Sequence, residues 1–341
     1  MSTAGQDRDR RARVVVVVNR RARRLDPARD RATGAHPLLD VLRARRPDVR
    51  VVETHSLADL DAAADELARE VPDAVVLAGG DGSYMAGITA LVRAFTVAGR
   101  SEEALPAIAL APGGTVSTVA RNWGFRGRGL FSRGEDAAAS YAARLIEAVS
   151  RGRARSAVRP TLRAKDDAAE RVGFIFGAGL VSRFFEVYED EGARGYGGAA
   201  SIVARVFMGS FTRGALASRV LTPAACVVEV DGVRMVQDRA SLVCASVVRD
   251  LGIGMRLLYR AAEEHDRFHV VATSLGPARL GPQLPLVLAG RPLLGAGNVD
   301  TLARTLALRF EGGGAYVLDG ELLRTERVVV SAGPVLRVLS V

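Results

Sequence analysis

The chain has 341 residues, a length that favours two domains, and its 48% hydrophobic and 25% charged residues are ordinary for a globular protein with a sizeable core. The net charge of +9, carried almost wholly by arginine, favours anionic partners such as nucleotide phosphates or an anionic membrane surface. Aromatic residues make up only 5% of the chain and do not alternate with basic ones, so no nucleic-acid partner is expected.

The cysteine, histidine and hydropathy patterns argue against several kinds of site and several classes of protein. Cys226 and Cys244 lie in apolar runs, which favours buried free thiols over a disulfide or a metal site. The histidines show no H-E-x-x-H spacing, so a zinc site is not expected. No run of about 18 apolar residues is present, and the charged N-terminus lacks the apolar segment of a secretory signal. The sequence therefore predicts a cytoplasmic protein that can still associate with a membrane surface.

The first part of the chain alternates apolar runs with amphipathic ones. Residues 1–12 are polar and Arg-rich and are predicted to be disordered. The β-branched run from Val14 to Val18 predicts a strand buried on both faces, ending at Asn19. Further strands are expected over 49–53, 74–78 and 107–111, and helices over 36–45, 57–70, 84–98 and 137–150. This alternation predicts a mostly parallel, doubly wound sheet.

Two glycine turns lie where strands of this sheet should end. The first is G-G-D-G-S at 79–83 and the second is G-G-T at 113–115, and each precedes a predicted helix. Glycine lets the backbone approach a ligand and tolerates positive φ, while the N-terminus of a helix offers free N–H groups to an anion. Because ligands of such sheets bind beyond the carboxyl ends of the strands, we expect a phosphate site there, with Asp81 placed to hold Mg²⁺. The predicted site residues are Asn19, Thr54, Gly79, Gly80, Asp81, Gly82, Ser83, Gly113, Gly114 and Thr115.

Two better-known phosphate motifs are absent. Lys165 is the only lysine of the chain, so there is no G-x-x-x-x-G-K-[ST] loop. A G-x-G-x-x-G fingerprint does not open the first βαβ unit either. Glycine-rich turns also occur in α/β proteins that bind no phosphate, so it is the pairing of two turns with one acid that favours a phosphate site. The Arg-rich loop at 20–24 fits either a phosphate contact or a solvated surface.

The pattern changes after about Gly152. Short β-rich runs bounded by Gly, Pro or Asp are interrupted by predicted helices over 183–191 and 199–211. The predicted strands are 157–163, 171–176, 225–230, 241–248, 268–272 and 305–310. We therefore expect an α/β domain over 13–152 and a β-rich, mostly antiparallel domain over 153–341. Near the end, L-D-G-E predicts a hairpin turn at Asp319-Gly320 followed by Glu321, a pattern that is also typical of a simple surface turn.

The motifs G-G-D-G-S, P-G-G-T with A-R, and the late L-D-G-E, in this order, resemble the diacylglycerol kinase catalytic-domain family, which includes bacterial lipid kinases and the sphingosine and ceramide kinases. The resemblance covers roughly residues 13–341 and includes V-G-F-I-F-G-A-G-L at 172–180. NAD kinases share the first motif, whereas the late D-G-E favours the lipid kinases. The family's fold, similar to that of NAD kinase, is an α/β nucleotide-binding domain beside a β-rich domain.

The resemblance implies an ATP- and Mg²⁺-dependent kinase that transfers the γ-phosphate to the hydroxyl of a diacylglycerol-like or sphingoid lipid. ATP would lie across Asn19, Thr54, the 79–83 turn and Thr115, with Asp81 serving the catalytic metal. Glu321 matches the proposed general base and Asp319 would support it. Asp266, in a worn version of a bacterial metal-binding segment, matches a structural Mg²⁺ ligand.

Such a lipid kinase would be a peripheral membrane protein. The positive charge and the V-F-M-G-S-F stretch at 206–211 suit docking on an anionic bilayer, although the same stretch also fits a protein core. Assembly as a homodimer is left open by the sequence.

Several positions depart from the family pattern. The family's Asn-Asp after the second turn is here Ser117-Thr118, and its Asn-Glu after the first turn is Met85-Ala86. Arg20 replaces a proline after Asn19, and Arg267 replaces the glycine after Asp266. Two acids near the phosphates are therefore missing. Two alternatives follow: a catalytically weakened member that regulates by binding nucleotide or lipid, and a kinase with a soluble acceptor, as in NAD kinase.

Overall fold

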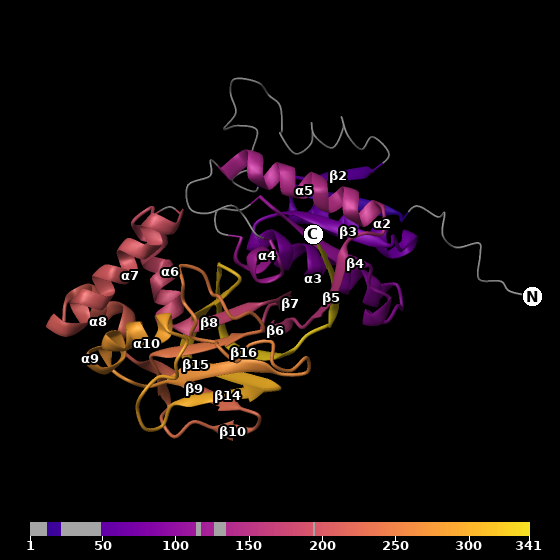
Figure 1. Ribbon diagram of the computed structural model, residues 1–341. Coiled ribbons are helices and arrows are strands. Elements are labelled where there is room, and N and C mark those ends of the chain that lie inside the picture. The colour runs from indigo at the N-terminus through magenta and orange to yellow at the C-terminus, as the bar shows by residue number, and fades with distance from the viewer. Residues whose placement is uncertain (1–11, 22–48, 114–116, 126–133, 194) are drawn as a thin grey trace, which may run out of the picture. The chain divides into compact units, whose positions relative to one another are not determined.

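The computed structural model describes residues 12–21, 49–113, 117–125, 134–193 and 195–341 (Figure 1). The chain forms two compact units, one made of residues 1–158 and 336–341 and the other of residues 159–335. The predicted boundary after residue 152 falls inside the first unit, and the C-terminal segment, which we expected in the second, returns to the first. The disorder predicted for residues 1–12 lies, apart from Ala12, outside the described residues, as does the helix predicted over 36–45.

The first unit is built on a mostly parallel sheet, as the alternating pattern predicts. Its strand order is β2-β1-β3-β4-β17-β5, and β1 pairs in parallel with both β2 and β3, β3 with β4, and β4 with β17. The strands are β1 (Val14–Asn19), β2 (Arg50–Thr54), β3 (Ala74–Gly79), β4 (Ala107–Pro112), β5 (Arg155–Arg159) and β17 (Leu336–Ser340).

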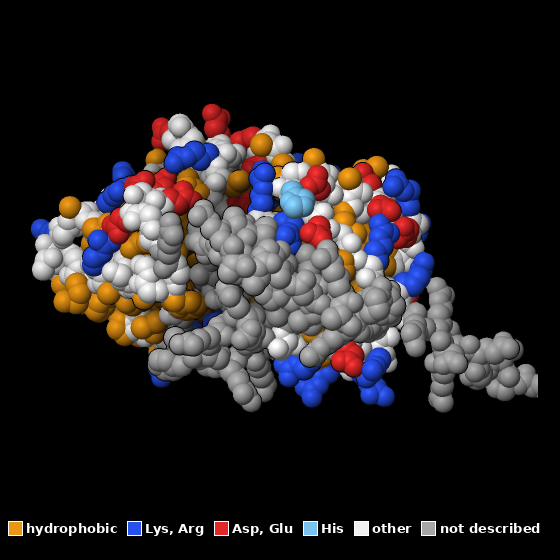
Figure 2. Space-filling model, turned by 90° about the horizontal axis from the view of Figure 1, so that it is seen from above, with side chains coloured by type: hydrophobic (Ala, Val, Ile, Leu, Met, Phe, Trp, Pro, Cys, Tyr) orange, Lys and Arg blue, Asp and Glu red, His pale blue; other side chains and the backbone are white. Residues whose placement is uncertain are grey.

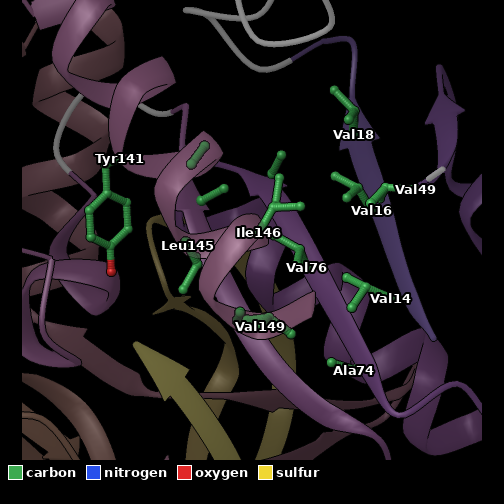
Figure 3. Packing of buried hydrophobic residues seen from close by; sticks show 14 of the residues in the cluster. Val14, Val16, Val18, Val49, Ala74, Val76, Tyr141, Leu145, Ile146 and Val149 are labelled. Atoms are coloured by element: carbon green, nitrogen blue, oxygen red, sulfur yellow. The ribbon is translucent and has the colours of Figure 1, made fainter. Parts of the chain in front are cut away.

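Helices cover both faces of this sheet, so the predicted doubly wound α/β fold is confirmed. They are α2 (Leu57–Glu70), α3 (Asp81–Val97), α4 (Thr118–Asn122) and α5 (Gly134–Ser150), with a 3-10 turn at Glu102–Ala104. On one face, alternate residues of β1 and β3 such as Val16 and Val76 pack against Leu145 and Ile146 of α5 (Figure 3). On the other face, Leu77 packs against α3, where Gly87 leaves room for its side chain.

The second unit is built on antiparallel strands. The main path runs β14-β13-β12-β8-β15-β16-β6-β7, and β9 pairs with β15 and with the short strands β10 and β11. The strands are β6 (Leu162–Asp166), β7 (Glu170–Gly173), β8 (Ile175–Gly179), β9 (Ala224–Val230), β10 (Val233–Arg234), β11 (Arg239–Ala240), β12 (Leu242–Ser246), β13 (Phe268–Thr273), β14 (Val299–Ala303), β15 (Thr305–Leu318) and β16 (Glu321–Ala332).

Two predicted strands are each divided in the structure. The run 157–163 is split between β5 and β6 around Pro160, which cannot donate a ladder hydrogen bond. The run 171–176 is split at Phe174 into β7, which pairs with β6, and β8, which pairs with β12 and β15. Strands β7 and β8 are therefore consecutive in the chain, although β15, β16 and β6 lie between them in the order of the sheet.

Helices of the second unit cover β12 and β13. They are α6 (Leu180–Asp190), α7 (Gly195–Thr212), α8 (Ala215–Leu221), α9 (Pro277–Leu280) and α10 (Leu284–Leu288), with a 3-10 turn at Gly281–Gln283. Their shared core includes Val187, Ile202 and Val220 from the helices and the free thiol Cys244 from β12. The other cysteine, Cys226, is also buried and free, as expected. None of the described helices has the length and hydropathy needed to span a bilayer.

The predicted hairpin near the C-terminus is confirmed. Strand β15 ends at Leu318 and β16 begins at Glu321, opposite Leu318. The two turn residues have positive φ, 49° at Asp319 and 90° at Gly320. A two-residue turn of this kind favours Asp-Gly because few other residue pairs adopt that backbone without strain.

Candidate active site

The carboxyl ends of four parallel strands lie at one edge of the first unit's sheet. Asn19 at the end of β1 is in register with Thr54 at the end of β2, and Gly79 at the end of β3 is in register with Pro112 of β4. Strand β1 lies between β2 and β3, so the strand order reverses between β1 and β3. Ligands of doubly wound sheets bind at such a reversal.

Hydrogen bonds join the predicted residues at this reversal. The Asn19 side-chain amide donates to Ser83 Oγ at 2.8 Å, and the Gly80 backbone N–H donates to the same oxygen at 3.3 Å. Gly113 N–H donates to the Gly79 carbonyl at 2.7 Å, which connects the second turn to the first. The Thr54 hydroxyl is buried and donates to the Val18 carbonyl at 3.3 Å, so this residue links the end of β2 to the end of β1.

Helix α3 begins at Asp81, immediately after β3, with Gly80 as its N-cap. The first helical bond runs from Tyr84 N–H to the Gly80 carbonyl, which leaves the N–H groups of Asp81, Gly82 and Ser83 without an intrahelical acceptor. These groups lie at the positive end of a 17-residue helix, an arrangement that suits the binding of an anion.

The glycines of the first turn are needed for close packing. A Cβ on Gly79 would lie 2.5 Å from Ser83 Cβ and Oγ, so a larger residue would displace the side chain that Asn19 holds. The positive φ values that the sequence allowed for Gly79, Gly80 and Gly82 do not occur. Gly114 and Thr115 of the second turn, and residues 22–24 of the basic loop, lie outside the described residues.

Asp81 has a structural partner that the sequence did not reveal. Its carboxylate accepts the backbone N–H of Thr118 at 2.8 Å and that of Val119 at 3.0 Å, so it caps the start of α4. Burial raises the pKa of Asp81, while these two N–H groups act in the opposite direction. Thr118, where the family carries an aspartate, thus meets Asp81 through its backbone.

The residues around Asp81 suit a metal that arrives with a nucleotide. In the described part of the chain, no group of three or more His, Cys, Asp or Glu side chains is close enough to enclose a metal ion. Mg²⁺ commonly binds through one or two carboxylates together with substrate phosphates and water. Asp81 fits that arrangement, since two N–H bonds leave acceptor capacity on its oxygens.

In the second unit, Asp319 fixes the hairpin that carries Glu321. The buried Asp319 carboxylate accepts the backbone N–H of Phe174 at 3.0 Å and that of Ile175 at 2.9 Å. A Cβ on Gly173 would lie 2.5 Å from an Asp319 carboxylate oxygen, so this approach requires glycine there. The residue therefore positions the turn against the β7–β8 junction.

Glu321 is exposed as a whole residue, yet partial desolvation of its carboxyl group raises the pKa of that group, and the charge of Arg171 acts in the opposite direction. Arg171 was not predicted from the sequence, where it stands in a charged stretch that resembles a solvated surface. No motif marked it.

Asp266 does not resemble a metal ligand in this structure. It is exposed and forms an ion pair with Arg304 at 2.6 Å, which lowers its pKa. In this structure the carboxylate thus has a guanidinium as its partner. Its role as a structural Mg²⁺ ligand stays a prediction.

Comparisons with known proteins agree with the motifs. Residues 13–154 match the family model for the diacylglycerol kinase catalytic domain. No curated protein matches the chain. Three solved structures from Bacillus anthracis str. Sterne share the fold over 97% of this chain and 98% of theirs, at identities that show the fold alone. Two are candidate diacylglycerol kinases, with TM-scores of 0.63 at 17% identity and 0.62 at 18% identity. The third is described as a diacylglycerol kinase, with a TM-score of 0.57 at 16% identity. The resemblance is therefore confirmed over residues 13–154, which match the family model for the diacylglycerol kinase catalytic domain.

Proposed function

We propose that the protein is an ATP- and Mg²⁺-dependent lipid kinase that transfers the γ-phosphate to the hydroxyl of a diacylglycerol-like or sphingoid lipid. One observation carries the proposal. The N-terminus of α3, with its available N–H groups and the Asn19–Ser83 pair, lies where the strand order reverses, in a domain that matches a kinase family.

Phosphoryl transfer requires mainly positioning and charge stabilisation, and the proposed residues would each have a separate role in it. The first turn of α3 would bind the phosphates, with Asn19 and Ser83 fixing its shape. Asp81 would hold Mg²⁺, which when bound supplies positive charge beside the phosphates. Glu321 would take the proton of the lipid hydroxyl while that oxygen attacks the γ-phosphorus and the bond to ADP breaks.

Access to a lipid acceptor requires contact with a bilayer, and α7 is suited to it. Arg205 is the only charged residue of this helix, and Met208 and Phe211 are 64% and 59% exposed. Hydrophobic side chains gather at the left of Figure 2, the side on which Figure 1 shows α7 and α8. An exposed helix face of this kind is uncommon on a protein that meets only water. The exposed Arg213 directly after the helix suits anionic headgroups, so we propose that α7 docks on an anionic bilayer.

One observation favours a second candidate, a nucleotide-binding regulator without turnover. Asp81 already accepts two backbone N–H groups, and the two neighbouring family acids are replaced by Thr118 and Ala86. A weaker metal site would preserve nucleotide binding and lose catalysis. A soluble acceptor such as NAD is the remaining alternative for the same nucleotide site.

The test is phosphorylation from ATP and Mg²⁺ across a panel of vesicle-borne lipid alcohols, with NAD and free sphingoid bases included. Asp81→Ala and Asp81→Asn are compared with Asp65→Ala, which changes an exposed acid of α2 in the same unit. We expect a phosphorylated lipid that both Asp81 variants fail to make and the Asp65 variant still makes. Product from NAD alone, or ATP binding without any product, would contradict the lipid kinase and support the respective alternative.

A further inference from the structure

Arg20, directly after β1, has a side chain whose hydrogen-bond donors are only partly used. The side chain is 12% exposed, so it is not solvated as an arginine of a surface loop would be. Its ion-pair partner is Glu53 of β2, with 3.4 Å between Arg20 Nε and Glu53 Oε2. Within the described part of the chain, neither Nε nor Nη1 of Arg20 has a hydrogen-bond acceptor, and both atoms are buried. The Glu53 carboxylate therefore lies near the guanidinium charge but leaves these donors available.

Such unused donors are rare among the residues that the structure describes. Three other arginines, Arg159, Arg183 and Arg267, each have one buried side-chain nitrogen without an acceptor there, and all three belong to the second unit. Arg20 has two, and it is the only residue of this kind in the described part of the first unit. A buried donor without an acceptor costs free energy, because it has lost its water and gained no partner. The cost would be recovered if a ligand brought an acceptor to these groups.

Hydrogen bonds hold Arg20 beside the 79–83 turn. The Arg20 backbone N–H donates to the Thr54 carbonyl at 3.0 Å, which extends the pairing of β1 with β2 by one residue. The Asn19 side chain uses both of its ends: its oxygen accepts the backbone N–H of Arg21 at 2.9 Å, and its amide donates to Ser83 Oγ at 2.8 Å. Arg20, between its two neighbours, is therefore fixed at the edge of the sheet where α3 begins.

The side chains at this edge lie on both faces of the sheet. Asn19 faces α3, since its amide bonds to Ser83. Glu53 is in register with Val18, the residue before Asn19, so its side chain lies on the opposite face, and the Arg20 guanidinium lies beside it. A ligand beyond the ends of β1 and β3 would thus meet the N–H groups of α3 from one face and Arg20 from the other.

We propose that Arg20 is a phosphate-binding residue of the nucleotide site, where its unused donors bind oxygens of the ligand. The inference rests on the proposed function, which requires a nucleotide at this edge. A guanidinium suits the role because its donors lie in one plane and form strong, charge-assisted hydrogen bonds with phosphate oxygens. Arg20 stands where the family pattern has a proline, which offers no such donor, so the contact would distinguish this chain from that pattern.

The test is isothermal titration calorimetry of the full chain with ATP, tripolyphosphate and adenosine, in the presence of Mg²⁺ and without lipid. Arg20→Met removes the donors and keeps a long unbranched side chain, whereas Arg20→Lys keeps the charge and loses the planar guanidinium. Arg100→Met changes an exposed arginine of the first unit and serves as the matched control. Thermal unfolding without ligand checks that each variant is folded.

We expect Arg20→Met to weaken the binding of ATP and of tripolyphosphate by roughly tenfold or more and to leave adenosine binding unchanged. Arg20→Lys should regain part of the loss, and Arg100→Met should bind all three ligands as the wild type does. A folded Arg20→Met with unchanged ATP affinity overturns the inference and leaves the proposed function standing. An equal loss for adenosine places the contact on the nucleoside and overturns the assignment to phosphate.

The lipid panel described above separates this inference from the kinase activity. A wild type that binds ATP with the expected dependence on Arg20, yet phosphorylates no lipid, supports the inference and refutes the lipid kinase. A wild type that binds neither ATP nor tripolyphosphate overturns both.

Discussion

At the scale of a single residue, Asp81 caps α4, and we propose that it also holds the nucleotide-bound metal. Asp81→Ala should lower the free energy of unfolding by about 1–2 kcal/mol, since Thr118 and Val119 lose their acceptor. Asp81→Asn keeps one acceptor oxygen and should cost less. Urea denaturation measures both, and Asp65→Ala provides the comparison with an exposed acid. Equal stability of Asp81→Ala and wild type would show that the cap is unimportant.

The charge of Asp81 also predicts a dependence of stability on pH. Burial raises the pKa of Asp81 in the folded protein above its ordinary value of 3.8, so the folded state binds this proton more tightly than the unfolded state. The stability contributed by this proton is present below that ordinary value and is lost as pH rises through the folded pKa. Relative to Asp81→Asn, the wild type should therefore lose stability as the pH rises from 3.8 through the folded pKa of Asp81. A constant difference between the two proteins would show that the carboxyl is not destabilised by burial.

At the scale of elements, much of the fold could be predicted because local patterns determine it. The run Val14–Val18 forms a strand since both faces of β1 are covered, and Asp319-Gly320 forms a turn since both residues accept positive φ. Contacts between distant segments could not be predicted. The sequence contains no sign that Asp81 meets Thr118 and Val119 through their backbone.

The charged stretch around Asp166 shows the same limit. Its composition indicates a solvated surface, yet Asp166 is 2% exposed because Tyr316, distant in sequence, covers it. The last strand is a further example. Leu336–Ser340 has an apolar pattern, but only the tertiary structure pairs it with β4 of the first unit.

Strand β17 should therefore stabilise a unit from which it is distant in sequence. Val338 is 2% exposed and pairs with Ile108 of β4. Val338→Ala should lower the free energy of unfolding of the first unit by about 1–3 kcal/mol. The exposed neighbour Arg337, changed to Ala, should leave it within about 0.5 kcal/mol. Hydrogen exchange of β4 amides locates the effect, and unaltered exchange there in Val338→Ala would contradict the assignment.

At the scale of the whole molecule, the likeness to known proteins in sequence covers less of the chain than the likeness in structure. The family model matches only residues 13–154, whereas the structural likeness extends over 97% of the chain. The turn after β3 needs a small residue, since a Cβ on Gly79 would lie 2.5 Å from Ser83, and a requirement of this kind makes a sequence pattern recognisable. The second unit needs mainly apolar residues at alternating strand positions, and many sequences meet that requirement.

The proposed docking on a membrane is also tested at the scale of the whole molecule. We expect the protein to sediment with anionic vesicles more than with neutral ones, and Met208→Ser combined with Phe211→Ser to weaken that binding by about tenfold or more. Val236→Ser removes another exposed apolar side chain of the second unit, 91% exposed, and should have no effect. Equal sedimentation with neutral and anionic vesicles would count against docking on an anionic surface.

The most direct test of the account compares single-turnover phosphoryl transfer from ATP to a vesicle-borne lipid in the wild type, Glu321→Gln and Glu326→Gln. Glu326 is an exposed glutamate on the same strand and serves as the matched control. We predict that Glu321→Gln slows transfer by roughly 10²–10⁴-fold, with ATP binding retained, and that Glu326→Gln is unaffected. An unchanged rate in Glu321→Gln would remove this residue from the reaction and contradict the mechanism proposed for the protein.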